Sequence, residues 1–176
     1  MLKKVTYFLF VAFVFVALIF AYLYYSLFLK KINFPDEKTY VYVRTNSNFE
    51  DVLQYLDEHK IVSNTIFFRE FAKLRNLHNN IHPGRYTIPK GMSKNELILL
   101  LRSGQSDEIT ITFYNLKNLK ELTEHLSKYI EAKESDLYDL LTSPQTHQKL
   151  GFNKNNFISL FIPNSYRFYW NTTAED

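Results

Sequence analysis

Residues Val5–Leu29 read VTYFLFVAFVFVALIFAYLYYSLFL, a run of twenty-five residues without a charge. As an α-helix rising about 1.5 Å per residue, this run would be roughly 37 Å long, compared with about 30 Å for the hydrocarbon core of a bilayer. Lys3 and Lys4 precede it, and Lys30 and Lys31 follow it. The run therefore predicts a single transmembrane helix, to which the rest of the chain is attached.

Two other interpretations of this run fit less well. A core helix that is apolar on all sides needs a larger protein around it than the remaining residues can build. A cleaved signal peptide usually has an apolar region of about 7–15 residues, and no small-x-small cleavage motif follows at Ser26–Leu29. We therefore expect an uncleaved anchor over residues 5–29.

The orientation of the anchor is not decided by the positive-inside rule, because lysines flank both of its ends. A short positive head followed by a long apolar run is typical of the start of an exported single-pass protein. We therefore expect residues 1–4 in the cytoplasm and the rest of the chain across the membrane. Tyr22, Tyr24 and Tyr25 lie toward the far end of the run, where amphipathic rings favour the membrane interface.

The composition excludes several classes of site and partner. The net charge of +3 is modest and the body of the chain has no basic stripe, so nucleic acid is not an expected partner. The absence of cysteine excludes disulfides, a thiolate nucleophile and a cysteine zinc site. We expect neither a metal nor a cofactor, because no metal-ligand spacing relates the histidines, which are His59, His78, His82, His125 and His147.

Residues 39–104 are predicted to form a small βααβ module with one further helix. Thr39–Arg44 and Arg85–Ile88 alternate as strands do, and a Pro83-Gly84 turn precedes the second. Two segments between the strands repeat apolar residues at helical spacing. With the strands side by side and both helices on one face, the arrangement resembles that of small LysM-like glycan-binding modules.

The two helices of this module have predicted caps and predicted buried faces. The first is expected to follow cap residues at 46–48, and the second to follow Ser63 or Asn64. The apolar residues expected to face the core are Phe49, Val52, Leu53 and Leu56 on the first helix, and Ile66, Phe67, Phe71 and Leu74 on the second.

A helix opened by the capping box Ser93–Glu96 and stopped by Gly104 is expected to end this region. Residues 105–176 then alternate as a strand at Glu108–Phe113 and return to helical spacing afterwards. We therefore predict an α+β fold. A polar linker over residues 30–38 joins the anchor to the module, and a second α+β domain begins at residue 105.

Two segments in the later part of the chain carry a family pattern. One begins PGRYTIPKGMS at Pro83 and continues with ELI at Glu96 and LRSG at Leu101; the other contains FIPNSY at Phe161 and TTAE at Thr172. They resemble the G-x-Y…M-S-x-x-E-I-L-x-x-L-x-x-G run and the F-x-P-D/N-T-Y…T-x-A-E segment of the membrane-anchored endolytic murein transglycosylases, the MltG or YceG-like family. With the anchor, the resemblance covers nearly the whole chain.

The resemblance implies an activity on peptidoglycan. The family cleaves nascent glycan strands between N-acetylmuramic acid and N-acetylglucosamine and leaves 1,6-anhydro-muramic ends, with one glutamate serving as acid and base. That glutamate lies in an A-S-I-V-E-K-E-like segment, and no such segment occurs between Met1 and Asp176. We therefore expect the catalytic glutamate downstream of Asp176 and predict no catalytic residue here. This chain alone, a fragment that ends early in the transglycosylase domain, is expected to be inactive. The implied location is the bacterial inner membrane, with the carboxyl-terminal part in the periplasm.

Other assignments stay open on the sequence alone. Glu108 and Glu121 are the best-placed carboxylates for an acid within the chain, but surface carboxylates are the simpler expectation. The chain could instead be a complete, non-catalytic membrane-tethered module that binds peptidoglycan. It could also be a scaffold that recruits cell-wall synthesis proteins through its anchor.

Aromatic residues are the best candidates for contacts with a glycan, because sugar faces stack on Tyr and Trp rings whose polar tips bond hydroxyl groups. Core packing is the competing role for each ring, and Pro163-Asn164 is equally good as a turn. The expected partners are peptidoglycan strands, the lipid bilayer and cell-wall synthesis proteins. The predicted substrate-binding residues are Tyr86, Asn164, Tyr166, Tyr169 and Trp170, with Asn171 as a further donor.

Overall fold

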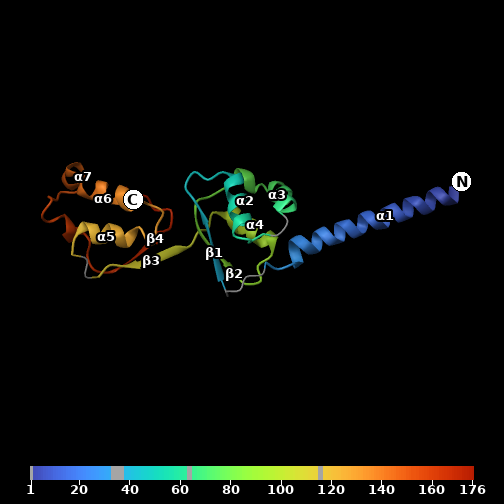
Figure 1. Ribbon diagram of the computed structural model, residues 1–176, viewed down its shortest axis with the longest axis horizontal. Coiled ribbons are helices and arrows are strands. Elements are labelled where there is room, and N and C mark those ends of the chain that lie inside the picture. Colours follow the sequence, from blue (N-terminus) through green and yellow to red (C-terminus); the bar gives the residue numbers. More distant parts are fainter. Residues whose placement is uncertain (1, 33–37, 63–64, 115–116) are drawn as a thin grey trace. The chain divides into compact units, whose positions relative to one another are not determined.

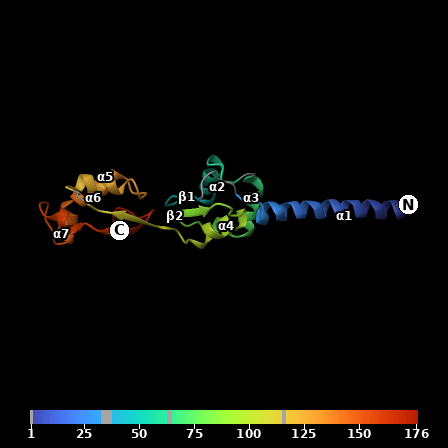
Figure 2. The ribbon, with the colours of Figure 1, turned by 90° about the horizontal axis from the view of Figure 1, so that it is seen from below.

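The computed structural model describes residues 2–32, 38–62, 65–114 and 117–176. It divides the chain into two units, whose elements are shown in Figure 1 and, turned by 90°, in Figure 2. Unit 1 consists of residues 1–40, 48–81 and 88–103, and unit 2 of residues 41–47, 82–87 and 104–176. Both contain helices and short strands, so the fold is α+β as predicted.

Unit 1 begins with a long helix, α1 at Leu2–Tyr24, which continues as a π-helical turn, η1, at Tyr25–Leu29. The segment Lys4–Leu29 has 26 residues and a mean hydropathy of 2.5, and its most apolar window is not buried inside the protein. Within the described part of the chain, it is the one helix long and apolar enough to cross a bilayer. Its length and composition agree with the predicted span.

The next four elements follow the predicted order of strand, helix, helix and strand. β1 at Lys38–Val43 pairs with β2 at Gly84–Pro89 in a two-stranded sheet. Between them in the chain lie α2 at Phe49–Glu58, α3 at Thr65–Leu74 and a 3₁₀ turn, η2, at Leu77–Asn79. Each of the two strands contributes residues to both units. The βααβ order is confirmed, whereas the likeness to LysM modules stays a prediction.

α2 forms where it is predicted because side chains cap its first turn. The Asn48 Oδ1 accepts hydrogen bonds from the Glu50 and Asp51 amides at 2.8 and 3.1 Å, and the Asp51 carboxylate accepts one from the Asn48 amide at 2.8 Å. These bonds satisfy amides that the helix itself leaves without partners. The four apolar residues predicted for its inner face are all buried: Phe49, Val52, Leu53 and Leu56.

α3 forms where the second helix is expected, but it buries a different face. Phe68 and Ala72 are 1% and 0% exposed. Three of the four residues predicted to be buried are instead 75%, 51% and 83% exposed: Ile66, Phe67 and Leu74. The predicted face was wrong because apolar residues occur on both sides of this helix, so spacing alone does not identify the covered side. The predicted cap, Ser63 or Asn64, lies outside the described residues.

α4 at Lys94–Ser103 is held at both ends as predicted. The Ser93 Oγ accepts a bond from the Glu96 amide at 3.2 Å, and the Glu96 carboxylate accepts one from the Ser93 amide at 2.7 Å. The bonds from Ser93 lower the pKa of Glu96. Gly104 ends the helix with φ +69°, and a Cβ there would lie 2.9 Å from the ring of His82.

The chain that leaves η1 is bound to the start of α4. Lys31 forms a β-bridge with Ser93, and the Ile32 amide donates to the Met92 carbonyl at 2.8 Å. Ile32 is only 6% exposed. The predicted linker over residues 30–38 is therefore packed at its start, and its residues from 33 up to β1 lie outside the described ones.

The core of unit 2 lies between a sheet and two helices. β3 at Glu108–Thr112 pairs antiparallel with β4 at Ser165–Tyr169, with Glu108 opposite Tyr169. Alternate residues of the sheet face the core, among them Ile109 and Ile111, and they pack with Leu122 of α5. β4 is not among the predicted strands. The segments between β3 and β4 are α5 at Leu119–Leu126, α6 at Glu134–Thr142, α7 at Pro144–Lys149 and a 3₁₀ turn, η3, at Phe157–Leu160.

Candidate functional site

Tyr86, the first predicted glycan contact, lies in the core. Its side chain is fully buried, and its hydroxyl donates to the His82 carbonyl at 2.9 Å. Burial, reinforced by the negative charge of Asp107, raises the pKa of Tyr86 to about 12. A ring so enclosed has no face for a sugar, and we leave Tyr86 out of the candidate site.

Asn164 and Tyr166 also have local roles. The Asn164 Oδ1 accepts a bond from the Ser165 amide at 2.7 Å, and its carbonyl accepts one from the Phe113 amide at 2.8 Å. The Tyr166 ring packs 5.1 Å from that of Phe113, and its hydroxyl donates to the Ile162 carbonyl at 2.9 Å. Asn164 therefore shapes the turn into β4, and Tyr166 fills the core behind it.

Among the predicted aromatic residues, Tyr169 is exposed and Trp170 is half-buried, with part of its ring packed against the core of unit 2. Because successive side chains of a strand point to opposite faces, Tyr169 lies on the outer face of the β3–β4 sheet, where it is 49% exposed. Trp170 follows directly and is half-buried. Its ring lies 5.1 Å from that of Tyr42 at the end of β1, with the planes tilted by 59°. The two rings belong to unit 2 and form one aromatic surface.

A carboxylate fixes the loops that carry these rings. Both carboxylate oxygens of Glu131 accept a hydrogen bond from the Thr45 amide at 3.1 Å. The Oε2 also accepts one from the Thr45 hydroxyl at 2.6 Å. The Glu131 amide donates to the Trp170 carbonyl at 2.7 Å. Glu131 thus joins the loop after Tyr42 to the turn after β4. We call this set the aromatic cluster: Tyr42, Thr45, Glu131 and Trp170.

Sequence reasoning found one member of the aromatic cluster and missed the other three. Tyr42 carried a partial signal, because strand alternation places it on the face opposite the buried Val41 and Val43. Thr45 and Glu131 carried none, since they are 86 positions apart and their pairing depends on tertiary structure.

Glu108 and Glu121 were the two carboxylates of this chain considered as catalytic acids. Each of them makes an ion pair or hydrogen bonds with neighbouring residues. Glu108 forms an ion pair of 3.2 Å with Arg167 across the outer face of the sheet. Glu121 accepts the Lys117 amide at 3.0 Å and the Asn118 side-chain amide at 3.1 Å, at the first turn of α5. These contacts fit the simpler expectation of surface and capping carboxylates.

The histidines do not converge on a metal site. Among the described residues, no group of three His, Asp or Glu side chains is placed to hold an ion. His147 is buried, with its Nε2 at 2.7 Å from the Leu141 carbonyl and its ring 4.2 Å from that of Phe157. It therefore packs in the helical part of unit 2.

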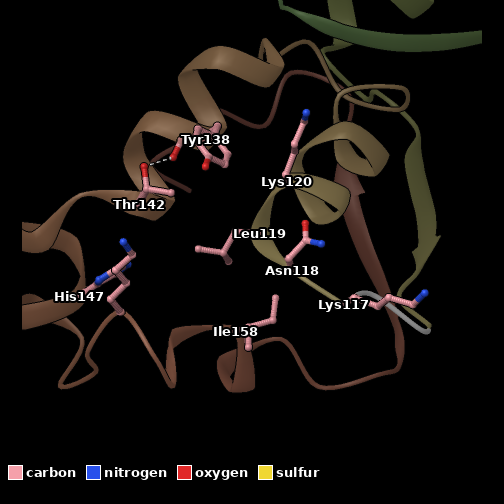
Figure 3. A pocket seen from close by; sticks show the side chains of 9 residues that line it. Lys117, Asn118, Leu119, Lys120, Tyr138, Thr142, His147 and Ile158 are labelled. Atoms are coloured by element: carbon pink, nitrogen blue, oxygen red, sulfur yellow. Dashed lines mark hydrogen bonds between the residues drawn. The ribbon is translucent and has the colours of Figure 1, made fainter.

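A cleft of about 470 Å³ lies in unit 2 among α5, α6, α7 and η3 (Figure 3). Leu119 and Ile158 line it with apolar surface, and the Thr142 hydroxyl bonds the Tyr138 carbonyl at 2.7 Å. The ammonium groups of Lys117 and Lys120 extend away from Leu119 in Figure 3. The ammonium groups of these two lysines therefore do not converge on the apolar part of this cleft. The remaining lining residues are Asn118, His147 and Lys154.

The fold and the aromatic cluster together describe an α+β protein with a helix of membrane-spanning length and a partly accessible aromatic surface. The model of the YceG-like family matches residues 41–176. The chain belongs to the YceG-like family, which confirms the resemblance seen in its motifs.

One solved structure provides a further comparison. The chain is similar to a YceG-like protein from Listeria monocytogenes, with 18% sequence identity and a TM-score of 0.37, over 75% of this chain and 48% of that one. This chain therefore spans about half the length of the protein it matches. No curated protein matches it.

Proposed function

We propose that this protein is a membrane-anchored endolytic lytic transglycosylase that cuts nascent peptidoglycan strands to 1,6-anhydro-muramic ends. Membership of the YceG-like family over residues 41–176 is the observation that carries the proposal, and the apolar helix that precedes the matched region supports it. Glu108, Glu121 and Glu131 each hold structural bonds, so we assign the catalytic acid to none of them. The location that suits this function is a bacterial inner membrane, with the residues after α1 in the periplasm.

Within this function, the aromatic cluster is the proposed contact with glycan. The rings of Tyr42 and Trp170 lie against each other, and Tyr169, the residue before Trp170, is exposed on the outer face of the β3–β4 sheet. Sugar rings stack on such surfaces, and polar ring tips bond their hydroxyl groups. Glu131, by holding Thr45 and the Trp170 backbone, keeps the two rings in place before a ligand arrives.

Binding is tested by co-sedimentation of the full chain, in detergent micelles, with insoluble peptidoglycan. If stacking on Trp170 contributes as much as an aromatic pair, about 0.5–1.5 kcal/mol, Trp170→Ala weakens retention by about two- to tenfold. Tyr138→Ala is the matched control, because Tyr138 is a 41% exposed ring elsewhere in unit 2. Equal retention of the two variants would remove the aromatic cluster from the site.

The reaction is tested with the protein purified from the membranes of cells that make it. Mass spectrometry of muropeptides should show 1,6-anhydro-muramic ends inside the glycan strand. Reducing ends would identify a hydrolase, which usually works with two carboxylates, and would contradict the proposed chemistry. Retention on peptidoglycan without any cleavage would favour the alternative of a non-catalytic membrane-tethered module.

A further inference from the structure

α3 carries an apolar stripe that unit 1 leaves mostly uncovered. Phe68 and Ala72 take the buried side of the helix, at 1% and 0% exposure. Phe67, Phe71 and Leu74 recur at positions i, i+4 and i+7, so they lie along one other side, and we call them the α3 stripe. Phe67 is 51% exposed and Leu74 is 83% exposed. Contiguous apolar surface of this kind marks a site of interaction rather than a surface that faces water.

The α3 stripe is continuous with the end of the apolar helix. The Phe71 ring meets the Phe28 ring edge-on at 5.6 Å, and Phe28 stacks on Tyr24 at 4.9 Å. Phe28 lies in η1, and the uncharged run ends one residue later, at Leu29. If α1 spans a bilayer, Phe28 lies where the hydrocarbon gives way to headgroups, and the α3 stripe begins at that level.

Basic side chains border the α3 stripe. The Arg75 guanidinium lies 5.2 Å from the centre of the Phe71 ring and 5.8 Å from that of Phe28. Lys30 and Lys31 directly follow η1. Arg102 is also at this place, because its guanidinium donates to the Arg75 carbonyl at 2.9 Å. Long basic side chains at an apolar edge suit the boundary of a bilayer, where the stem stays in the apolar layer and the charge reaches phosphate.

Two carboxylates near this edge are matched by cations. Glu70, on α3 itself, forms an ion pair of 3.3 Å with Lys73, and Glu96 lies 3.9 Å from Lys31. The basic groups named above outnumber these carboxylates. An anionic surface therefore complements this edge of unit 1 better than a neutral one.

We propose that α3 lies in the interfacial layer of the same bilayer that α1 crosses, with the α3 stripe among the upper acyl chains and Arg75 at the phosphates of anionic lipids. A helix with one apolar side and a basic edge binds membranes in this way, at about 5–10 Å into the headgroup and acyl boundary. The inference rests on the anchoring by α1 in the proposed function. It adds a second membrane contact, which holds unit 1 flat against the surface instead of leaving it to swing on a tether.

The absence of cysteine makes the test specific, because each introduced thiol is the one labelling site. The full chain carrying Phe67→Cys or Leu74→Cys is labelled with an environment-sensitive fluorophore and reconstituted into vesicles of phosphatidylcholine and phosphatidylglycerol. Lipids with a nitroxide on the upper acyl chain serve as quenchers. Gln54→Cys on the exposed side of α2 is the matched control in unit 1, and Tyr22→Cys, 64% exposed in α1, reports on the anchor.

The proposal expects strong lipid quenching at positions 67 and 74, strong quenching at position 22, and little at position 54. It also expects quenching at positions 67 and 74 to be weaker in vesicles of phosphatidylcholine alone. Quenching of equal strength with and without phosphatidylglycerol would overturn the role of anionic lipid. Labels at 67 and 74 that stay in water while position 22 is quenched would overturn the proposal and leave the anchor intact. Labels shielded from water but not quenched would overturn it too, since a protein surface would then cover the α3 stripe. An unquenched position 22 would instead refute the anchoring by α1.

Discussion

Tyr86 of the β1–β2 sheet and Tyr169 of the β3–β4 sheet differ most in how far their rings are exposed. In the β1–β2 sheet, Tyr86 and its neighbour on the same face, Ile88, are 0% exposed. In the β3–β4 sheet, Tyr166 faces the core while Tyr169 is 49% exposed on the outer face. The comparison shows that alternation along a strand fixes which residues share a face, whereas packing by other elements decides which face remains open. A tyrosine in such a strand is therefore a glycan candidate only when its own face is uncovered.

The largest effect is expected from removing the buried ring. Tyr86→Ala should lower the free energy of unfolding by about 3–5 kcal/mol, because deletion of a large core ring adds a cavity to the lost apolar burial. Denaturant unfolding in detergent, followed by circular dichroism, measures the change. A loss similar to that of Tyr169→Ala would mean that the two rings do not differ in burial as described.

The second largest loss of stability is expected from a substitution at the turn that leads into β2. Gly84 has φ +146°, so Gly84→Ala should lower the free energy of unfolding by about 1–3 kcal/mol through backbone strain alone. The clash adds to this loss, because a Cβ at position 84 would lie 2.4 Å from the Cβ of Ser106. Gly91→Ala is the control, since Gly91 also has a positive φ, +83°, but no neighbour within 4 Å of a Cβ. Equal losses in the two variants would show that contact with Ser106 is unimportant.

A smaller effect is expected when only the hydroxyl of the buried ring is removed. Tyr86→Phe leaves the His82 carbonyl without its bond and should cost about 0.5–1.5 kcal/mol at neutral pH.

The same variant should change how stability depends on pH. The pKa of Tyr86 is about 12 in the folded protein and 10.0 ordinarily, so the unfolded chain loses this proton first. The contribution of Tyr86 to stability is complete below pH 10.0 and is lost as the pH rises toward about 12. Across this pH range, the free energy of unfolding should fall more steeply for the native protein than for Tyr86→Phe. Parallel curves would contradict the burial of this hydroxyl.

The smallest effect on stability is expected on the open face. Tyr169→Ala should change the free energy of unfolding by no more than about 0.5 kcal/mol, as surface substitutions usually do. The same variant should nevertheless reduce retention on insoluble peptidoglycan, because Tyr169 is an exposed ring on which a sugar can stack. A stable variant with undiminished retention would restrict the site to Tyr42 and Trp170.

Much of the fold could be predicted because its signals are local. The cap of α2, the capping box at Ser93 and Glu96 and the stop at Gly104 all depend on residues within one helical turn. The length and composition of the apolar run were also readable directly from the sequence. The family motifs could be recognised for the same reason, since each is a short continuous segment.

The features of the fold and of the candidate site that could not be predicted depend on contacts between residues that are distant in the sequence. The buried side of α3 is set by what packs on Phe68 and Ala72, and no periodicity reports that. β4 is a five-residue strand whose partner, β3, lies more than fifty positions earlier. Thr45 and Glu131 of the aromatic cluster were missed for a similar reason, because Glu131 reaches Thr45 only in the folded chain.

The interleaving of the two units has a consequence for the order in which the chain folds as it is made. Thr45 precedes its partner Glu131 by 86 positions. At a synthesis rate of about 5–20 residues per second, that gap corresponds to a wait on the order of ten seconds. The helices α2 and α4 need only local bonds and can form during this wait. Unit 2 closes last, because its earliest segment, residues 41–47, waits for residues that are made after position 104.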